Sequence, residues 1–310
     1  MSNNTHVFGP VPSRRLGLSL GVSPIPEKTC NYSCTYCQLG RTNCMTNKRE
    51  LFYPVKEIAD QVKKALEKNK AIDVVSIVGE GEPTLYAGLG ELIDLIKTFT
   101  DKPVALITNA ALFYDDQVRK ESAKADIVLP SLDGYNKKSW KSIDRPYGRL
   151  AFDTVLDGLI KFGQEYKGQH WIEIMLVHGQ NDSDEALSAF SSIISNIKHN
   201  RLYVNTPVRP PAESFVEPTS HAVVAKFAEA LGGTAIDALV STGFASDIVD
   251  DFEALHSIIL RHPMNKFEVE NFLDTRNVSG KKKAIVFTQL NSDKTVTATE
   301  YKGIITYRAN

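Results

Sequence analysis

Short apolar runs alternate with amphipathic segments along most of this chain. Residues 73–78 and 104–108 are brief apolar runs, which are typical of buried strands. Residues 54–69 carry apolar side chains at helical spacing, with proline at the start, where it fits the first turn of a helix. Strands of about six residues that alternate with helices predict βαβ units and a parallel sheet. The expected fold class is therefore α/β.

The same alternation extends over the first three quarters of the chain. It predicts six strands, at residues 16–22, 73–78, 104–108, 127–132, 171–177 and 202–205. It predicts helices at residues 54–69, 88–99, 116–124, 152–166, 184–199 and 222–231. In barrels built from such units, sites lie at the C-terminal ends of the strands.

The last part of the chain changes character, which predicts two domains, residues 1–245 and 250–310. Helices are expected at residues 252–260, 265–273 and 281–290, followed by hairpin strands at 295–299 and 303–307. Three short helices and a terminal hairpin resemble a winged helix. The second domain is therefore expected to be small and winged-helix-like.

Charge is balanced overall but not at this end. The net charge of -1 gives no general attraction to nucleic acid or to a membrane. Residues 276–308 hold seven Lys or Arg against Asp293 and Glu300, so this segment is a candidate for contact with nucleic acid. The alternative is that Lys281, Lys282 and Lys283 are simply a solvated helix start.

Apolar runs and cysteines limit the compartment. No apolar run resembles a signal peptide, and none approaches the ~20 residues that span a bilayer. The four cysteines, three of them clustered, do not resemble a disulfide framework. We expect a cytoplasmic protein without a membrane partner.

Cys30, Cys34 and Cys37 form the cysteine cluster. Thiolates hold the irons of iron–sulfur clusters, and three of them leave one iron of a [4Fe–4S] cluster open to a small molecule. The alternative is a tetrahedral zinc site that includes Cys44. Zinc cysteines usually come as two close pairs, and Cys44 has no close partner.

The run from Cys30 to Cys37 resembles the signature of the radical S-adenosylmethionine superfamily, with the aromatic Tyr36 before the third cysteine. The resemblance implies a [4Fe–4S] cluster on Cys30, Cys34 and Cys37, with S-adenosylmethionine bound to the open iron. In that family one electron from the cluster breaks a carbon–sulfur bond, and the resulting 5′-deoxyadenosyl radical abstracts hydrogen from the substrate. It also implies a partial (β/α)6 barrel and an electron donor such as flavodoxin or ferredoxin.

Further motifs at strand ends resemble cofactor-binding motifs of that family. Gly79-Glu80-Gly81-Glu82 resembles its Gly-Gly-Glu motif, with Glu80 in place of the first glycine. Thr108-Asn109-Ala110 resembles Thr-Asn-Gly, and Ser131-Leu132-Asp133 resembles a Ser-Leu-Asp pair. The resemblance assigns cofactor binding to Tyr36, Glu80, Gly81, Glu82, Asn109, Ser131 and Asp133, of which Glu82 is expected to position the methionine amine and Asp133 to bind the ribose or the carboxylate. Ordinary turns and strand ends are the alternative.

The segments 8–22 and 37–42 narrow the resemblance to a group related to the wyosine-synthesis enzymes, which modify a tRNA guanosine. The archaeal wyosine enzymes carry a second set of cysteines, and this chain has only Cys44 to spare. That difference argues against wyosine synthesis itself. Arg14 and Arg15 are expected either to border the site or to lie on a solvent-facing turn.

Two functions follow from these motifs. The first is a radical enzyme that acts on an unidentified substrate, which is tRNA or another RNA, a small molecule or a peptide. Arg145 and Arg209 are candidates to clamp an anionic group of that substrate. The second function is a metal-binding regulator, with zinc or an iron–sulfur cluster, whose winged helix binds nucleic acid. The Gly-Glu-Gly-Glu-Pro run and the polar strand ends favour the enzyme.

Overall fold

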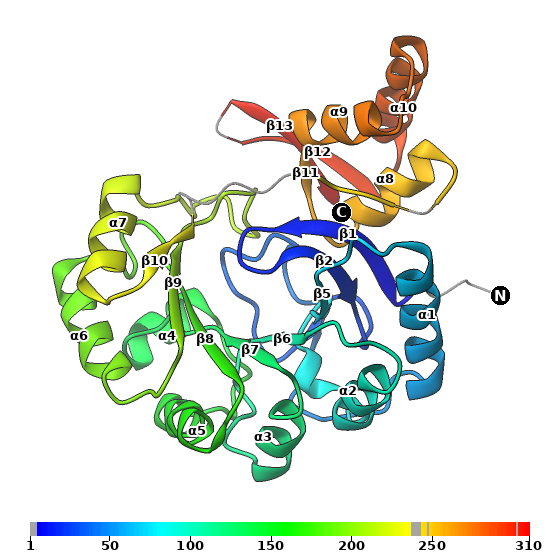
Figure 1. Cartoon of the computed structure of the whole chain (residues 1–310). Coiled ribbons are helices and arrows are strands. Elements are labelled where there is room, and N and C mark those ends of the chain that lie inside the picture. Colours follow the sequence, from blue (N-terminus) through cyan, green and yellow to red (C-terminus); the bar gives the residue numbers. More distant parts are fainter. Residues whose placement is uncertain (1–4, 237–242, 247, 302) are drawn as a thin grey trace.

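The fold is built on an open sheet of mostly parallel strands (Figure 1). The structure is a computed structural model that describes residues 5–236, 243–246, 248–301 and 303–310. In the described residues the strand order of the main sheet is β1-β2-β5-β6-β7-β8-β9-β10. Strands β2 to β10 are parallel to their neighbours, and β1 pairs antiparallel with β2. Because β1 and β10 are both edges, the sheet does not close on itself.

All six predicted strands are present in the predicted order, and two further strands extend the sheet. The strands are β1 (Val7–Ser13), β2 (Gly17–Val22), β5 (Val74–Ile77), β6 (Val104–Thr108), β7 (Ile127–Pro130), β8 (Gln169–Met175), β9 (Arg201–Asn205) and β10 (Thr234–Ala235). Strand β1 was not predicted, because Pro10 and Pro12 interrupt its strand-like pattern. The strand can contain these prolines because it lies at the edge of the sheet. Strand β10 has two residues, too few for a pattern.

Helices flank the sheet and bury its outer face (Figure 1). They are α1 (Val55–Lys68), α2 (Leu89–Lys97), α3 (Asp116–Ser122), α4 (Lys137–Ile143), α5 (Phe152–Glu165), α6 (Asp184–Ile194) and α7 (His221–Ala230), with a short 3-10 turn at Pro83–Leu85. The sequence did not predict α4, which begins at a capping box between Asn136 and Ser139. Two short strands, β3 (Thr29–Cys30) and β4 (Cys44–Met45), bracket the cysteine loop.

The inner face of the sheet is apolar at one end and polar further along. Leu16, Val74, Ile127 and Trp171 are buried together near the starts of the strands. One step along β2 from this cluster, the Ser19 hydroxyl donates to the Ser76 hydroxyl over 2.7 Å. The packed end acts as a floor, and the polar positions beyond it face a cavity.

The predicted C-terminal helices and hairpin are also present, and residues 251–309 are here called the C-terminal unit. It contains α8 (Asp251–Ile259), β11 (Met264–Asn265), α9 (Lys266–Thr275), α10 (Gly280–Ser292), β12 (Val296–Tyr301) and β13 (Ile304–Ala309). Its sheet order is β11-β13-β12, and β11 was not predicted. The unit packs against β1, whose Phe8 and Val11 share one apolar core with Leu255 and Phe272 (Figure 1).

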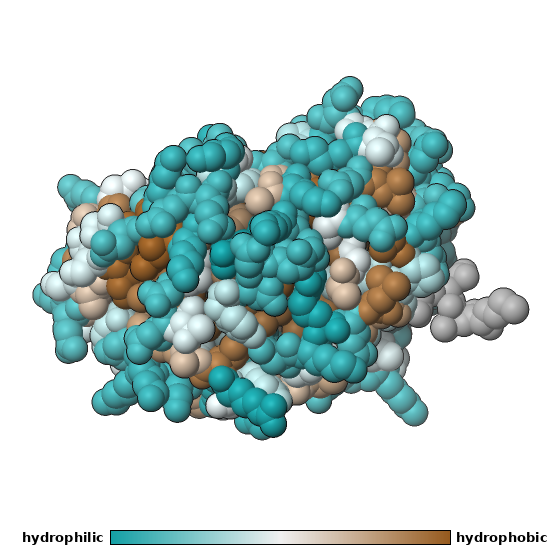
Figure 2. Space-filling view, turned by 90° about the horizontal axis from the view of Figure 1, so that it is seen from below, coloured by the Kyte–Doolittle hydropathy of each residue, from teal (hydrophilic) through white to brown (hydrophobic). Residues whose placement is uncertain are grey.

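The face of the molecule seen from below is largely hydrophilic, with hydrophobic residues in scattered groups (Figure 2). The polar sides of the helices that cover the sheet contribute to this face, because their apolar sides pack against the core. Among the described residues, no helix combines the length and the apolar composition that a membrane crossing requires.

His170, at the start of β8, makes folding stability depend on pH. Its ring is buried against Phe162, and its Nδ1 lies 2.7 Å from the Lys198 carbonyl oxygen. Burial lowers the pKa of His170 from 6.5 to about 4. Between pH 6.5 and 4, His170 is therefore protonated in the unfolded chain but neutral in the folded chain. The contribution of the neutral, buried His170 to folding stability is lost as pH falls through this range.

We expect the free energy of unfolding to fall by about 3 kcal/mol over this range through His170 alone. Urea denaturation at several pH values measures the slope, and the variant His170→Gln, which cannot titrate, is the comparison. A slope that His170→Gln leaves unchanged would contradict this origin of the pH dependence.

Candidate active site

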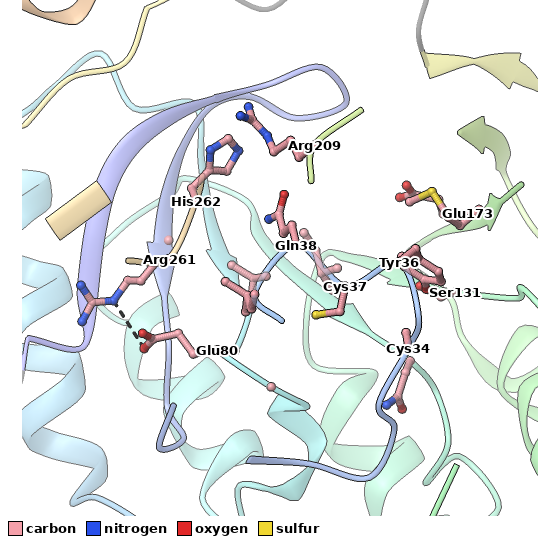
Figure 3. Close-up of a pocket in the computed structure, with 18 of the residues that line it drawn as sticks. Cys34, Tyr36, Cys37, Gln38, Glu80, Ser131, Glu173, Arg209, Arg261 and His262 are labelled. Carbon is pink, nitrogen blue, oxygen red and sulfur yellow. Dashed lines mark ion pairs between the residues drawn. The ribbon is translucent and has the colours of Figure 1, made fainter. Parts of the chain in front are cut away.

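Cys30 ends β3, Cys34 and Cys37 lie on the loop between β3 and β4, and all three open into one cavity of about 420 Å³. The cavity runs over the C-terminal ends of the parallel strands, and Figure 3 shows Cys34 and Cys37 among its lining residues. Its volume falls in the range of small-molecule sites, about 300–1,000 Å³. The structure thus brings the predicted cluster ligands together at the predicted end of the sheet.

The environment of the three thiols suits a cationic iron cluster. Burial raises the pKa of Cys34 well above its usual value, and the Asp144 carboxylate, which accepts from Cys34 Sγ over 3.5 Å, adds to the rise. Burial also raises the pKa values of Cys30 and Cys37. Thiolates here need nearby positive charge, which the irons of a cluster supply.

A four-cysteine zinc site does not fit this arrangement. Within the described parts of the chain, no three His, Cys, Asp or Glu side chains converge on one metal ion. In an iron–sulfur cluster the thiolates bind different irons, so they do not need to converge. Cys44 is exposed on β4 and is not part of the cavity lining. The donors present fit the cluster predicted from Cys30, Cys34 and Cys37.

Glu213 is bound by two arginines, one within the cysteine loop and one after α4. Arg41 binds the Glu213 carboxylate with two bonds of 2.8 Å, and Arg145 binds the same carboxylate. Hydrogen bonds from both arginines lower the pKa of Glu213 to about 2. The backbone N–H of Glu213 donates to Thr35 over 3.1 Å, between two of the cysteines. Arg145, expected as a clamp for substrate, is outside the cavity lining and supports the loop instead.

Glu82 is a buried carboxylate that protein donors already surround. Oε1 accepts from the Thr84 amide over 2.9 Å and from the Thr108 hydroxyl over 2.6 Å. Oε2 accepts from the Asn109 amide over 2.8 Å. Burial raises the pKa of Glu82, and these bonds counteract the rise. The carboxylate therefore joins the turn after β5 to the end of β6 and also lines the cavity, and its expected contact with the methionine amine stays a prediction.

Gly81 allows the turn after β5 to approach the cysteine loop. A Cβ atom at this position would lie 1.8 Å from the carbonyl oxygen of Thr29, so only glycine fits. Glu82 donates its amide to that same oxygen over 3.1 Å. Glu80, the residue before Gly81, lines the cavity. The Glu80 carboxylate lies 3.4 Å from Nε of Arg261 in the C-terminal unit (Figure 3).

Asn109, Ser131 and Tyr36 line the cavity, as expected for residues near the cofactor. Asn109 also supports the cysteine loop, because its Nδ2 donates to Asn31 over 2.7 Å. Asp133 is not among the residues that line this cavity. Its carboxylate accepts from the Tyr36 hydroxyl and, over 2.7 Å, from the Met175 amide, and it lines a smaller cavity behind Tyr36. The Asp133 carboxylate thus supports Tyr36 from behind, and its expected contact with the ribose or the carboxylate stays a prediction.

Charged residues that the sequence did not assign with certainty complete the cavity. Arg14 and Arg15, in the turn between β1 and β2, are half-buried and line the cavity. Arg15 pairs with Glu173, which also accepts from Asn205 over 3.1 Å. Burial, together with the neighbouring Arg14, lowers the pKa of Arg15 to about 10.

Glu173, Arg261 and His262 also line the cavity and were missed. Glu173 carried a usable signal, since it is the one charged residue in the apolar run Ile172–Leu176. Arg261 and His262 carried none, because only the docking of the C-terminal unit brings them to the site.

Comparison with known proteins decides the family. Residues 25–190, more than half of the chain, match the Radical SAM superfamily. The chain belongs to the radical SAM superfamily. Members of the radical SAM superfamily are enzymes that use a [4Fe–4S] cluster with S-adenosylmethionine, so the predictions of an enzyme and of these two cofactors are confirmed at the level of the family.

Curated relatives extend the radical SAM match. A UPF0026 protein of Methanocaldococcus jannaschii is 34% identical over 317 residues, which cover 99% of this chain and 96% of that protein. A UPF0026 protein of Helicobacter pylori is 39% identical over 66% of this chain and 67% of its own. The GTPase Obg of Brachyspira hyodysenteriae is 45% identical over 66% of this chain, which spans only 30% of that protein.

Solved structures agree on the radical SAM fold. A radical SAM methyltransferase from Sphaerobacter thermophilus is 17% identical, with a TM-score of 0.54, over 71% of this chain and 68% of its own. SuiB from Streptococcus suis bound to S-adenosylmethionine is 19% identical, with a TM-score of 0.52, over 69% of this chain and 47% of its own. At these identities the likeness concerns the fold alone.

Replacing Gly81 with alanine should damage the site. The added Cβ would collide with Thr29, so we expect Gly81→Ala to lower the free energy of unfolding by at least about 2 kcal/mol. Gly148→Ala is the matched control, because a Cβ there meets nothing within 4 Å. Urea denaturation of both variants tests this, and equal stability of the two would refute the close approach.

Proposed function

We propose that this protein is a radical SAM enzyme with one [4Fe–4S] cluster, held by Cys30, Cys34 and Cys37. The supporting observation is that three half-buried cysteines open into a single cavity together with the polar ends of the strands. When bound, the cluster supplies one electron to break a carbon–sulfur bond of S-adenosylmethionine, and the 5′-deoxyadenosyl radical so formed takes hydrogen from the substrate. The electron comes from a donor such as flavodoxin or ferredoxin.

The chain's own residues position the cofactors in this proposal. Glu82 fixes two strand ends, and Gly81 brings the turn after β5 close to the cysteine loop. Tyr36, Asn109 and Ser131 face S-adenosylmethionine from the cavity wall. Glu80 supports its binding from the turn, as described below, and Asp133 keeps Tyr36 in place.

The proposal also covers the barrel and the size of the substrate. Residues 1–245 form a partial (β/α)6 barrel in this proposal, and the cavity inside it receives the substrate. A cavity of about 420 Å³ that also holds S-adenosylmethionine admits a small molecule or one group of a larger one. A peptide would insert a side chain, and an RNA such as tRNA would insert a single nucleotide. The link to proteins related to wyosine synthesis stays a prediction.

In this proposal residues 250–310 form a winged-helix-like domain, which contains the C-terminal unit. The support is its element order, in which one strand separates the first two helices and the sheet order is β11-β13-β12. Lys281 and Lys282 are exposed at the start of α10, while Lys283 pairs with Asp274. Lys302 lies outside the described residues. A regulator without enzymatic activity is not favoured, since it leaves the cavity and the family unexplained.

The central test is anaerobic reconstitution with iron and sulfide, reduction with dithionite and assay for 5′-deoxyadenosine from S-adenosylmethionine. We expect wild-type protein to form it and Cys34→Ala to form none, because that variant lacks a cluster ligand. Cys44→Ala is the matched control, since its thiol lies on the surface. Iron content is measured alongside.

Two outcomes would contradict the proposal. Cleavage of S-adenosylmethionine by Cys34→Ala would show that Cys34 is not a ligand of the cluster. Loss of iron in Cys44→Ala would make Cys44 a ligand and restore the four-cysteine site.

Nucleic-acid contact through α10 has a separate test. If Lys281 and Lys282 meet phosphates, the double variant Lys281→Glu, Lys282→Glu should bind tRNA at least about tenfold more weakly, with a smaller dependence of affinity on salt. Filter binding at several salt concentrations measures both quantities. The control is Lys137→Glu, Lys138→Glu on the exposed face of α4. Equal loss in both double variants would show a general charge effect and no site on α10.

A further inference from the structure

Glu80 departs from the family's Gly-Gly-Glu motif, and the structure shows what its side chain does. The backbone of Glu80 is fixed on both sides, since its amide donates to the Ser23 hydroxyl over 3.1 Å and its carbonyl accepts from Lys28 over 2.6 Å. From this fixed backbone the carboxylate extends to Arg261, with 3.4 Å between Oε2 and Nε (Figure 3). A glycine at this position would leave Arg261 without that partner.

Arg261 connects three parts of the chain at this point. Its Nη1 donates to the Ser257 carbonyl over 3.2 Å in α8, the helix that ends just before it. Its Nη2 donates to the Thr5 carbonyl over 2.7 Å, just before β1, and its guanidinium lies 5.7 Å from the ring centre of Phe8. The pair with Glu80 adds the turn after β5. Arg261 therefore links the C-terminal unit to the turn that borders the cavity.

The ion pair between Arg261 and Glu80 is mostly buried, so its loss should cost more than the loss of a surface pair. The side chains of Arg261 and Glu80 are each only 13% exposed. Burial raises the pKa of Glu80, and the charge of Arg261 counteracts the rise. Removing one member of such a pair leaves the other charge buried without compensation, which costs more than losing a surface ion pair. The turn would then relax away from its position.

The C-terminal unit is well fixed above the cavity, so it can hold the turn. Arg209, after β9, binds Glu268 of α9 with two bonds of 3.0 Å. Arg308 of β13 donates to the Pro211 carbonyl over 2.9 Å. These contacts and the shared apolar core around Phe8 anchor the unit at several places. Arg261 is thus held by a rigid support.

We propose that Arg261 is a positioning residue for S-adenosylmethionine, acting through Glu80. The ion pair fixes the turn after β5 against the cavity, so the affinity for the cofactor depends on the C-terminal unit. The inference rests on the proposed function and deepens it, because it makes residues 251–309 a part of the cofactor site. It also accounts for the glutamate at the position of the family's glycine.

The test measures equilibrium binding of S-adenosylmethionine to reconstituted protein without reductant, by equilibrium dialysis. We expect Arg261→Gln to raise the dissociation constant about tenfold, which is about 1.4 kcal/mol, with unchanged iron content. Arg276→Gln is the matched control. Arg276 also lies in the C-terminal unit and pairs with Asp251 over 2.7 Å, but it is outside the cavity lining. This variant should bind the cofactor like the wild type.

A double-mutant cycle separates positioning from general loosening of the fold. Glu80→Gln should weaken binding as Arg261→Gln does, and the double variant should be little worse than either, because both substitutions remove one interaction. Additive losses would overturn the proposal, as would an unchanged dissociation constant in Arg261→Gln or an equal loss in Arg276→Gln. A wild-type protein that binds no S-adenosylmethionine would instead refute the proposed function, and this inference with it.

Discussion

The buried carboxylate of Glu82 is the constraint on which the cavity depends. A charge in this position is tolerated only when hydrogen bonds surround it, and the donors come from Thr84, Thr108 and the Asn109 amide. Meeting that demand fixes the ends of β5 and β6 side by side. Asn109 then passes the constraint to the cysteine loop through Asn31. One carboxylate thus sets the relative positions of the strand ends and the thiols.

The main sheet was predictable because its parallel strands are buried on both faces. Such strands read as short apolar runs, and each predicted run became a strand in the predicted order. Local pattern does not identify β1, which prolines interrupt, or β10, whose two residues are paired only because β9 lies beside them. Pairing with a neighbour, and not local propensity, made these two segments strands.

Sequence motifs predicted which residues reach the cavity, but they did not predict the direction in which each side chain points. The cysteines, Gly81, Asn109 and Ser131 reach the cavity as their motifs indicated. Glu82 lines the cavity as well, but its carboxylate and that of Asp133 accept hydrogen bonds from protein donors, and a motif does not record the direction of a side chain. Arg261 and His262 depend on the docking of a distant unit, which no local pattern reports.

The shared core of β1 and the C-terminal unit has a consequence for biosynthesis. Phe8 and Val11 leave the ribosome long before their partners Leu255 and Phe272, which lie far along the same chain. Until then the apolar side of β1 lacks its cover, although the parallel sheet behind it can already form. Chains of this size expose such surfaces to aggregation while they wait. The exposure therefore ends only once the residues of the C-terminal unit have been made and can pack against β1.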